Sequence, residues 1–303
     1  MMSQAEYEYR IGLPLDEKLF LTQTRIREMV EWSEENEFTP VINFSGGIDS
    51  TVLMAIVRDL YPNTPALFSN TGLEFPELVA FTRQFKDVYE VRPSKPFHHV
   101  VAEYGWPVSS KKIALMVETV RANRPTRAAS INLYLKGMNR AGIYVPRWKI
   151  PQKWRILLDA PFKVSAKCCD FLKKEPFKKH EKTGRYSYIT GQMATDSEQR
   201  RESYLRTGCN AFNAGRGPKS NPMSFWTKED VWAFVRAHGL PYASVYDMGY
   251  AKTGCVFCGF GCHLDKTPNR FQLLKQTHLK LWEYVMHNLG MADVLKYIRV
   301  PSE

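Results

Sequence analysis

The first hundred residues of the chain alternate between two hydrophobic patterns. Short apolar runs such as Val41-Ile42-Asn43-Phe44 indicate buried strands, whereas apolar positions three and four apart, as in 16–35, indicate helices with one buried face. The predicted elements are a helix over 16–35, a strand over 40–44, a helix over 50–60, a strand over 66–69, a helix over 75–86 and a strand over 87–91. Alternation at this spacing favours an α/β, Rossmann-like fold, in which a parallel twisted sheet has right-handed crossovers and helices on both faces.

The pattern changes after residue 104. Residues 105–165 are rich in Arg, Lys, Pro and Trp and have weaker periodicity, which indicates a basic insertion or a helical lid. A strand over 186–189, a capped helix that starts at Thr227 and a helical tail over 268–298 then resume the regular pattern. The predicted organisation is an N-terminal helix and βαβ core over 1–104, the insertion over 105–165, and the rest of the core with the helical tail over 166–303.

The segment Ser45-Gly46-Gly47-Ile48-Asp49-Ser50 lies between the first predicted strand and the helix that follows it. A glycine turn at this position leaves backbone N–H groups free beside the positive end of a helix, which suits an anion. Two adjacent glycines also permit positive φ and a close approach of the backbone to a phosphate. No lysine follows the second glycine, so this is not a G-x-x-x-x-G-K-[ST] loop. We predict a phosphate site here, and a simple tight turn is the alternative.

The net charge of +11 is unevenly distributed along the 303 residues. Between Lys111 and Thr190 there are 19 Lys and Arg against 5 Asp and Glu, so this segment carries +14 and the rest of the chain −3. Aromatic residues alternate with the cations of this segment, a pattern typical of surfaces that bind nucleic acid. The alternative is a solvated charged face near an anionic cofactor.

The location of the protein follows from what the sequence does not contain. No apolar stretch approaches 18 residues, and the first residues lack the basic-then-apolar pattern of a secretory signal. We therefore expect a cytoplasmic protein with no membrane partner. In that compartment, the six cysteines are expected to be ligands or redox groups rather than disulfides.

Four of the cysteines form two pairs, Cys168-Cys169 and the C-x-x-C motif of Cys255 and Cys258. A C-x-x-C motif is typical of metal or dithiol chemistry, and four thiolates suit an iron–sulfur cluster or a tetrahedral zinc site. We predict cluster or metal binding by this set, with iron–sulfur ahead of zinc. Cys209 is expected to be a small buried apolar residue. The role of Cys262, beside His263, stays open between a spare ligand, a redox thiol and neither.

Two further segments follow predicted strands and carry polar residues. Thr71-Gly72-Leu73-Glu74-Phe75-Pro76-Glu77 suits nucleotide recognition at the strand end, although a helix start with proline in its first turn explains much of it. The second segment runs from Thr190 to Arg200 and follows the strand predicted over 186–189.

These segments, in this order, resemble the PP-loop adenine-nucleotide alpha-hydrolases, and in particular their phosphoadenosine phosphosulfate (PAPS) reductase family. The resemblance runs from about residue 38 to 262, broken by 105–165. It implies that this family's fold holds ATP or another adenylyl nucleotide with Mg²⁺. The implied phosphate cradle comprises Ser45, Gly46, Gly47, Asp49 and Ser50, with Asp49 as a Mg²⁺ ligand or turn-fixing group. Further nucleotide contacts are implied at Thr71, Gly72, Glu74, Gly191 and Ser197, and catalytic roles at Ser45, Asp49 and Arg200.

The paired cysteines are similar to those that hold a [4Fe–4S] cluster in assimilatory adenosine phosphosulfate (APS) reductases, which implies Cys168, Cys169, Cys255 and Cys258 as ligands.

The sequence also departs from the family pattern. Met193 and Asp196 stand where relatives carry arginine and glutamate, and no cysteine follows Cys262. Sulfonucleotide reductases carry a C-terminal E-C-G-[IL]-H segment whose cysteine attacks the sulfate sulfur.

Three hypotheses follow. In the first, the protein is an ATP pyrophosphatase of the PP-loop type that cleaves at the α-phosphate and supports sulfur transfer with its cluster, on a nucleic acid (tRNA or DNA) and with a sulfur-donor protein. In the second, it is an APS or PAPS reductase that uses Cys262 as an unusual thiol. In the third, it is a nucleic-acid-binding or nucleotide-sensing subunit without turnover.

Overall fold

A six-stranded sheet forms the centre of the fold. The computed structural model describes every residue of the chain except 1, 214 and 216. The strand order is β3-β2-β1-β5-β7-β6, and all neighbours are parallel except the pair of β7 and β6. The strands are β1 (Thr39–Asn43), β2 (Ala66–Ser69), β3 (Val88–Val91), β5 (Tyr186–Thr190), β6 (Asn210–Ala211) and β7 (Lys219–Ser220). The predicted α/β fold with a mostly parallel sheet is confirmed.

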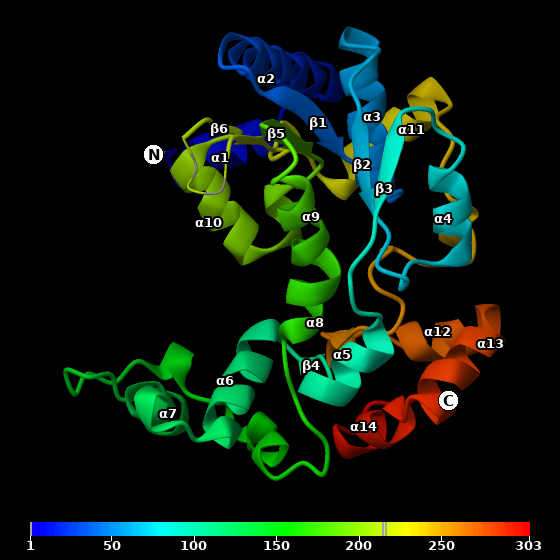
Figure 1. Cartoon of the computed structure of the whole chain (residues 1–303). Helices are drawn as coiled ribbons and strands as arrows, with labels where there is room; N and C mark the ends of the chain where they lie inside the picture. The colour runs from blue at the N-terminus through cyan, green and yellow to red at the C-terminus, as the bar shows by residue number, and fades with distance from the viewer. Residues whose placement is uncertain (1, 214, 216) are drawn as a thin grey trace.

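The strand order reverses direction next to β1. The chain runs from β1 outward through β2 to β3, and then returns to place β5 on the other side of β1. Right-handed crossovers therefore put α3 (Ile48–Leu60) and the helix that precedes β5, α9 (Glu175–His180), on opposite faces of the sheet (Figure 1). The carboxyl ends of β1 and β5 lie at this reversal, which is where ligands bind in open α/β sheets.

Helices cover the sheet and continue its core. The predicted helix over 16–35 is α2 (Leu15–Glu35), and the capped helix after Thr227 is α11 (Lys228–His238). The predicted helix over 75–86 is shorter in the structure, where α4 covers only Pro76–Thr82. The chain then turns toward β3 through Asp87, which adopts a positive φ of 54°. Two helices that the hydrophobic pattern did not indicate, α1 (Gln4–Ile11) and α10 (Glu198–Thr207), lie next to each other in Figure 1.

A second lobe lies below the sheet in Figure 1. Its centre is a two-residue parallel pair between β4 (Val108–Ser109) and β8 (Gly259–Phe260). Its helices are α5 (Phe97–Tyr104), α6 (Lys111–Ala122), α7 (Ala128–Lys136), α8 (Lys167–Cys169), α12 (Arg270–Thr277), α13 (Leu279–Glu283) and α14 (Met291–Tyr297). The predicted helical tail is thus α12 to α14. The division at residues 104 and 165 stays a prediction, and the β4–β8 pair ties the first residues of the predicted insertion to the C-x-x-C segment.

None of the helices among the described residues combines the length and the apolar composition that a membrane crossing requires.

A buried ion pair fixes the start of α11. The Lys18 ammonium on α2 lies 2.6 Å from a carboxylate oxygen of Asp230, and the lysine side chain is 2% exposed. The same carboxylate accepts the Thr227 backbone N–H at 2.7 Å and so completes the capping box of the helix. Because the Lys18 ammonium is buried, the Asp230 carboxylate must compensate for the loss of its hydration.

We expect the substitution Asp230→Ala to lower the free energy of unfolding by about 3–5 kcal/mol, because it leaves the Lys18 ammonium buried without a counter-charge. Urea unfolding followed by circular dichroism measures the loss. The matched control is Glu6→Ala, which removes the i,i+4 pair with Arg10 on the surface of α1 and should cost less than about 1 kcal/mol. Equal losses in the two variants would contradict this assignment.

Candidate functional site

The loop after β1 has the conformation that the glycine pair predicts. Gly46 has φ +72°, and α3 begins directly after Gly47. The buried Ser50 hydroxyl accepts the Ser45 N–H at 3.1 Å and donates to the Gly47 carbonyl at 2.8 Å. Ser50 therefore shapes the turn from behind, while the Ser45 side chain is exposed.

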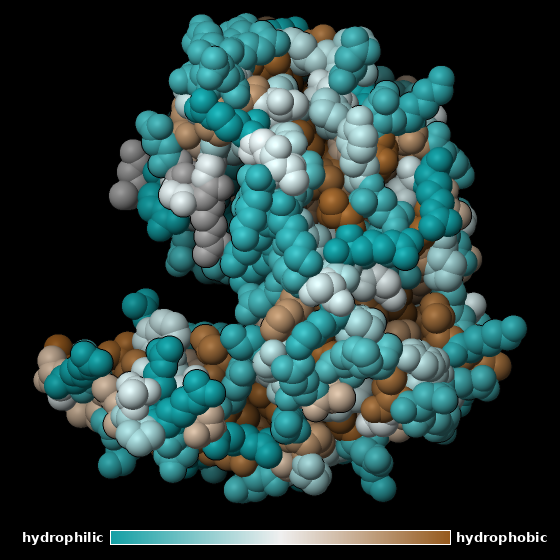
Figure 2. All heavy atoms as spheres, viewed as in Figure 1, coloured by the Kyte–Doolittle hydropathy of each residue, from teal (hydrophilic) through white to brown (hydrophobic). Residues whose placement is uncertain are grey.

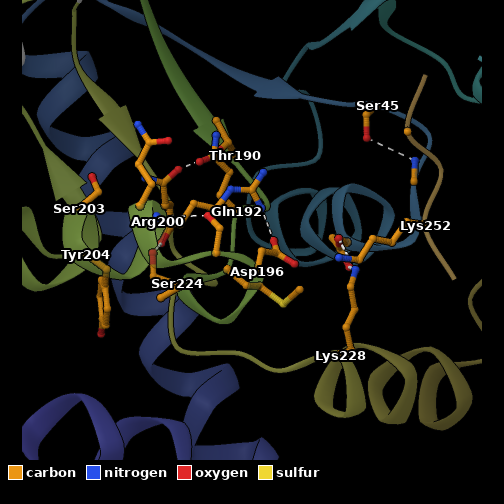
Figure 3. A pocket seen from close by; sticks show the side chains of 18 of the residues that line it. Ser45, Thr190, Gln192, Asp196, Arg200, Ser203, Tyr204, Ser224, Lys228 and Lys252 are labelled. Carbon is orange, nitrogen blue, oxygen red and sulfur yellow. Dashed lines mark hydrogen bonds and ion pairs between the residues drawn. The ribbon is translucent and has the colours of Figure 1, made fainter. Parts of the chain in front are cut away.

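The loop opens into a cleft of about 710 Å³, a volume within the range of small-molecule sites. Ser45, Gly47 and Asp49 line one part of it, and Gln192, Ser197 and Arg200 line another (Figure 3). Gly46 and Ser50 lie outside the lining. The predicted cradle and the segment after β5 thus face a common space, although they are about 150 residues apart in the sequence.

Gly191 permits this approach of the two loops. A Cβ atom at Gly191 would lie 2.9 Å from the Asp49 carbonyl oxygen, closer than real Cβ contacts allow. The absence of a side chain therefore lets the loop after β5 pack directly on the backbone of the loop after β1. Gly191 supports the cleft and does not line it.

The cleft is lined by more cations than carboxylates. Its charged residues are Lys111, Arg200, Lys219, Lys228 and Lys252 together with Asp49 and Asp196. Both carboxylates are already paired: Lys228 donates to the two oxygens of Asp49 at 2.5 Å, and Arg200 donates to Asp196. Among the described residues, Lys111, Lys219 and Lys252 have no carboxylate partner. This surplus of positive charge suits an anionic ligand.

Burial raises the pKa of Asp49 above its ordinary value, and the charge of Lys228 acts in the opposite direction. Asp49 is thus held by an ion pair within the protein. A Mg²⁺ ion coordinated by Asp49 would have to displace the Lys228 ammonium from one or both oxygens.

Several residues of the cleft were not predicted from the sequence. The Ile48 N–H at the start of α3 donates to the Tyr246 hydroxyl at 2.8 Å, and that hydroxyl lies 3.1 Å from the Thr253 hydroxyl. Lys228 is the first residue of α11. The helix cap at Thr227 was visible in the sequence, but nothing local places its next residue beside Asp49.

The turn after β2 lies elsewhere. Thr71, Gly72 and Glu74 do not line the cleft. The Glu74 carboxylate accepts the Thr71 N–H at 2.9 Å and its hydroxyl at 2.8 Å, so it closes its own turn. The Leu73 carbonyl accepts the Val256 N–H at 2.8 Å, which places this turn beside the C-x-x-C motif. A nucleotide contact at these residues remains a prediction.

The two cysteine pairs come together between the lobes. All six cysteines are free, and the thiols of Cys168, Cys169, Cys255 and Cys258 are close enough for their charges to affect one another. A hydrogen bond from Cys168 holds the pKa of Cys169 well below its ordinary value, and the charges of Lys111 and Lys173 act in the same direction. Burial raises the pKa of Cys255 to about 11.

Cluster or metal binding by this cysteine set remains a prediction, with iron–sulfur ahead of zinc. Within the described part of the chain, no three His, Cys, Asp or Glu side chains converge closely enough to hold a single metal ion. A structural zinc site requires four ligands about 2.0–2.3 Å from one ion. A [4Fe–4S] cluster attaches its cysteines through separate irons, so their sulfurs lie further apart.

Arg270 anchors the C-x-x-C loop. Its guanidinium pairs with Asp265 at 2.6 Å and donates to the carbonyls of Cys258 at 3.1 Å and Phe260 at 3.0 Å. The remaining cysteines, Cys209 and Cys262, are buried. Burial raises the pKa of Cys209 to about 11 and that of Cys262, whose residue is 1% exposed, to about 12.

Comparison with known proteins places these features in a family. The family described as Phosphoadenosine phosphosulfate reductase domain matches residues 39–145 and 149–259. The chain is 36% identical over 92 residues to the adenosine 5'-phosphosulfate reductase of Allochromatium vinosum, a match that covers 30% of this chain and 34% of that protein. It is 26% identical over 235 residues to the enzyme of the same name from Lysinibacillus sphaericus, and there the match covers 76% of this chain and 78% of the relative.

Two solved structures are also similar. The phosphoadenylyl-sulfate reductase of Candida auris in its phosphate complex has a TM-score of 0.43 and 14% identity, over 84% of this chain and 96% of that chain. The FMN adenylyltransferase of Candida glabrata has a TM-score of 0.42 and 11% identity, over 82% of this chain and 67% of that chain.

We expect the substitution Gly47→Ala to weaken the binding of AMP at least about 10-fold, or ~1.4 kcal/mol. A Cβ atom at Gly47 would lie 2.8 Å from the Thr253 hydroxyl, so it would push Thr253 off the loop and disturb its contact with Tyr246. Isothermal titration calorimetry measures the affinity.

The control for this variant is Gly254→Ala. Gly254 also lines the cleft, but no atom lies within 4 Å of its added Cβ. Unchanged AMP binding by the Gly47 variant, or an equal loss in the Gly254 variant, would show that the loop geometry does not determine binding.

Proposed function

The chain belongs to the phosphoadenosine phosphosulfate reductase domain family, and from this premise we propose that it binds a sulfonucleotide, APS or PAPS, in the cationic cleft and reduces its sulfate to sulfite. One observation carries the proposal. The loop 45–50 lies at the point where the strand order reverses, and it opens into a cleft lined by three lysines. Among the described residues, no carboxylate pairs with these lysines. The names of the relatives favour the same reaction class.

The proposed binding mode follows from the geometry. The Ser45 hydroxyl and the N-terminal end of α3 would receive the phosphoryl group, and Lys252 would neutralise it. Arg200, at the other part of the cleft, would contact a second anionic group. Arg200 donates to Asp196 in the structure, so it would have to break this ion pair before it contacts the ligand.

The reducing electrons are proposed to come from a separate thiol reductant. A thiolate that attacks the sulfur displaces the nucleotide, and a second thiol then releases sulfite and leaves a disulfide. No cysteine of the described residues lines the cleft, and Cys262 is buried with a raised pKa. We therefore propose that the attacking thiolate belongs to the reductant and not to Cys262. Because all six cysteines are free, the protein is proposed to work in a reducing compartment, the cytoplasm.

A second candidate is favoured by a specific observation. Residues 121–155 contain nine Lys and Arg and no Asp or Glu, and they follow α6, whose first residue Lys111 lines the cleft. In this candidate, the cleft binds ATP with Mg²⁺, releases pyrophosphate and transfers the adenylyl group to a nucleic acid, which a sulfur donor then modifies. A [4Fe–4S] cluster on Cys168, Cys169, Cys255 and Cys258 would support electron or sulfur transfer in either candidate.

The two candidates differ in their products. We expect the protein to release sulfite from APS or PAPS in the presence of a dithiol, and to release no pyrophosphate from ATP. Parallel sulfite and pyrophosphate assays measure this. Pyrophosphate release that depends on added tRNA or DNA would instead support the second candidate, and failure to bind APS, PAPS or ATP would contradict both.

Anaerobically purified protein is expected to contain about four irons per chain and to absorb visible light. The variant Cys255→Ser should lose most of this iron, because it removes one of the four thiols that lie together. Cys209→Ser is the matched control and should keep its iron, since Cys209 is buried beside Tyr204 and apart from the set. Iron analysis and absorption spectra compare the two, and full iron in the Cys255 variant would contradict the assignment.

A further inference from the structure

Residues 121–155 form a projecting segment, here called the basic arm. It comprises α7, the loop after it and the 3-10 turns Pro125–Arg127 and Pro146–Trp148, and it projects sideways from the second lobe in Figure 1. Its nine cations face no acid of its own, because the arm contains no Asp or Glu. Neither the nucleotide cleft nor the cysteines require these cations.

Two of the nine cations hold the arm together. Arg121 donates to the carbonyls of Phe162 at 2.6 Å and Ala160 at 3.0 Å, and Arg155 donates to that of Leu135 at 2.9 Å. Six others are exposed and have no ion pair with any residue that the structure describes. They are Arg124, Arg127, Lys136, Arg140, Arg147 and Lys153. The arm therefore has a folded base and a free cationic surface.

Aromatic rings accompany these cations. Tyr134 and Trp148 are stacked at 28°, and the Lys112 ammonium lies 4.5 Å from the centre of the Trp148 ring. The Lys149 ammonium lies 5.8 Å from the ring of Tyr144, which is 54% exposed. Exposed rings beside cations are the combination on which unpaired bases stack while their phosphates are neutralised.

Several apolar residues of the arm are only partly covered by the residues that the structure describes. None of the residues of α7 is buried, although the helix contains Ile131, Leu133 and Leu135. Ile143, at the tip, is 61% exposed. Figure 2 shows hydrophobic and hydrophilic residues mixed over the arm, with a hollow between the arm and the sheet lobe. This surface exposes apolar side chains to water beside unpaired cations. It is therefore suited to a partner that has flat apolar faces and negative charge.

The arm is also connected to the cleft. Helix α6 runs from Lys111, which lines the cleft, to the base of the arm at Ala122. Its 12 residues span about 18 Å. A strand with about 3.4 Å between stacked nucleotides covers that length with about five nucleotides.

We propose that the basic arm binds a single-stranded nucleic acid, with bases stacked on Tyr144 and the Tyr134–Trp148 pair and phosphates on the exposed cations, and that the strand runs along α6 toward the cleft. The inference deepens the second candidate function by naming the surface and the strandedness of the partner. Binding at the arm itself requires neither proposed reaction. Unpaired bases are required because a duplex hides its base faces from the rings.

Fluorescence anisotropy with labelled oligo-dT, oligo-U and a DNA duplex of about 12 units each tests the proposal on the full chain. We expect both single strands to bind more tightly than the duplex, and affinity to fall steeply with salt. The double variant Arg140→Ala/Tyr144→Ala should weaken single-strand binding at least about 5-fold and reduce the salt slope by about 0.7, the share of one phosphate contact. The comparison of oligo-dT with oligo-U distinguishes DNA from RNA.

The control is Arg83→Ala/Tyr89→Ala, an exposed arginine and an exposed tyrosine near the β3 edge of the sheet, which should not change binding. AMP binding, measured in parallel, should be the same in both double variants, so a defect in the arm is distinguishable from a failure of the cleft. Three results would overturn the proposal: no salt-dependent binding by the unaltered protein, equal losses in the two double variants, or a preference for the duplex.

Discussion

The close approach of two loops without an intervening side chain determines the arrangement of the site. At the carboxyl ends of β1 and β5, the backbone at Gly191 contacts the backbone at Asp49. This contact brings the start of α3 to the same space as the loop that carries Arg200. A side chain at Gly191 would separate the two loops and widen the cleft, whatever the identity of the polar residues that line it.

Charge determines what the cleft and the cysteines can bind. Each carboxylate in the cleft is already neutralised by a cation, and the additional lysines favour an anion. Lys111 belongs to both environments, because it lines the cleft and its charge lowers the pKa of Cys169. The occupancy of the cleft and the charge of the cysteine set are therefore electrostatically connected through one side chain.

The sequence predicted the parts of the fold that depend on local pattern. The strands and the helix starts follow from short apolar runs and capping residues, and they lie within a residue or two of their predicted positions. The ion pair of Lys228 and Asp49 joins residues 179 positions apart, so no local pattern could indicate it. The turn of Thr71–Glu74 follows β2, which lies on the far side of β1 from the reversal point, and the strand order that decides this is not visible in the sequence. The two-residue strands β4 and β8 are too short to produce an alternating pattern.

The hydroxyl of Tyr246 has a consequence for the thermodynamics of ligand exchange. It already accepts the N–H of Ile48, the first residue of α3, and an anion bound at this end of the helix would compete for the same N–H. An incoming phosphoryl oxygen at this amide replaces one hydrogen bond with another of similar strength, so little enthalpy is gained there. The attraction between the ligand and the lysines of the cleft must then supply most of the binding free energy, so the affinity depends on the ionic strength of the surroundings.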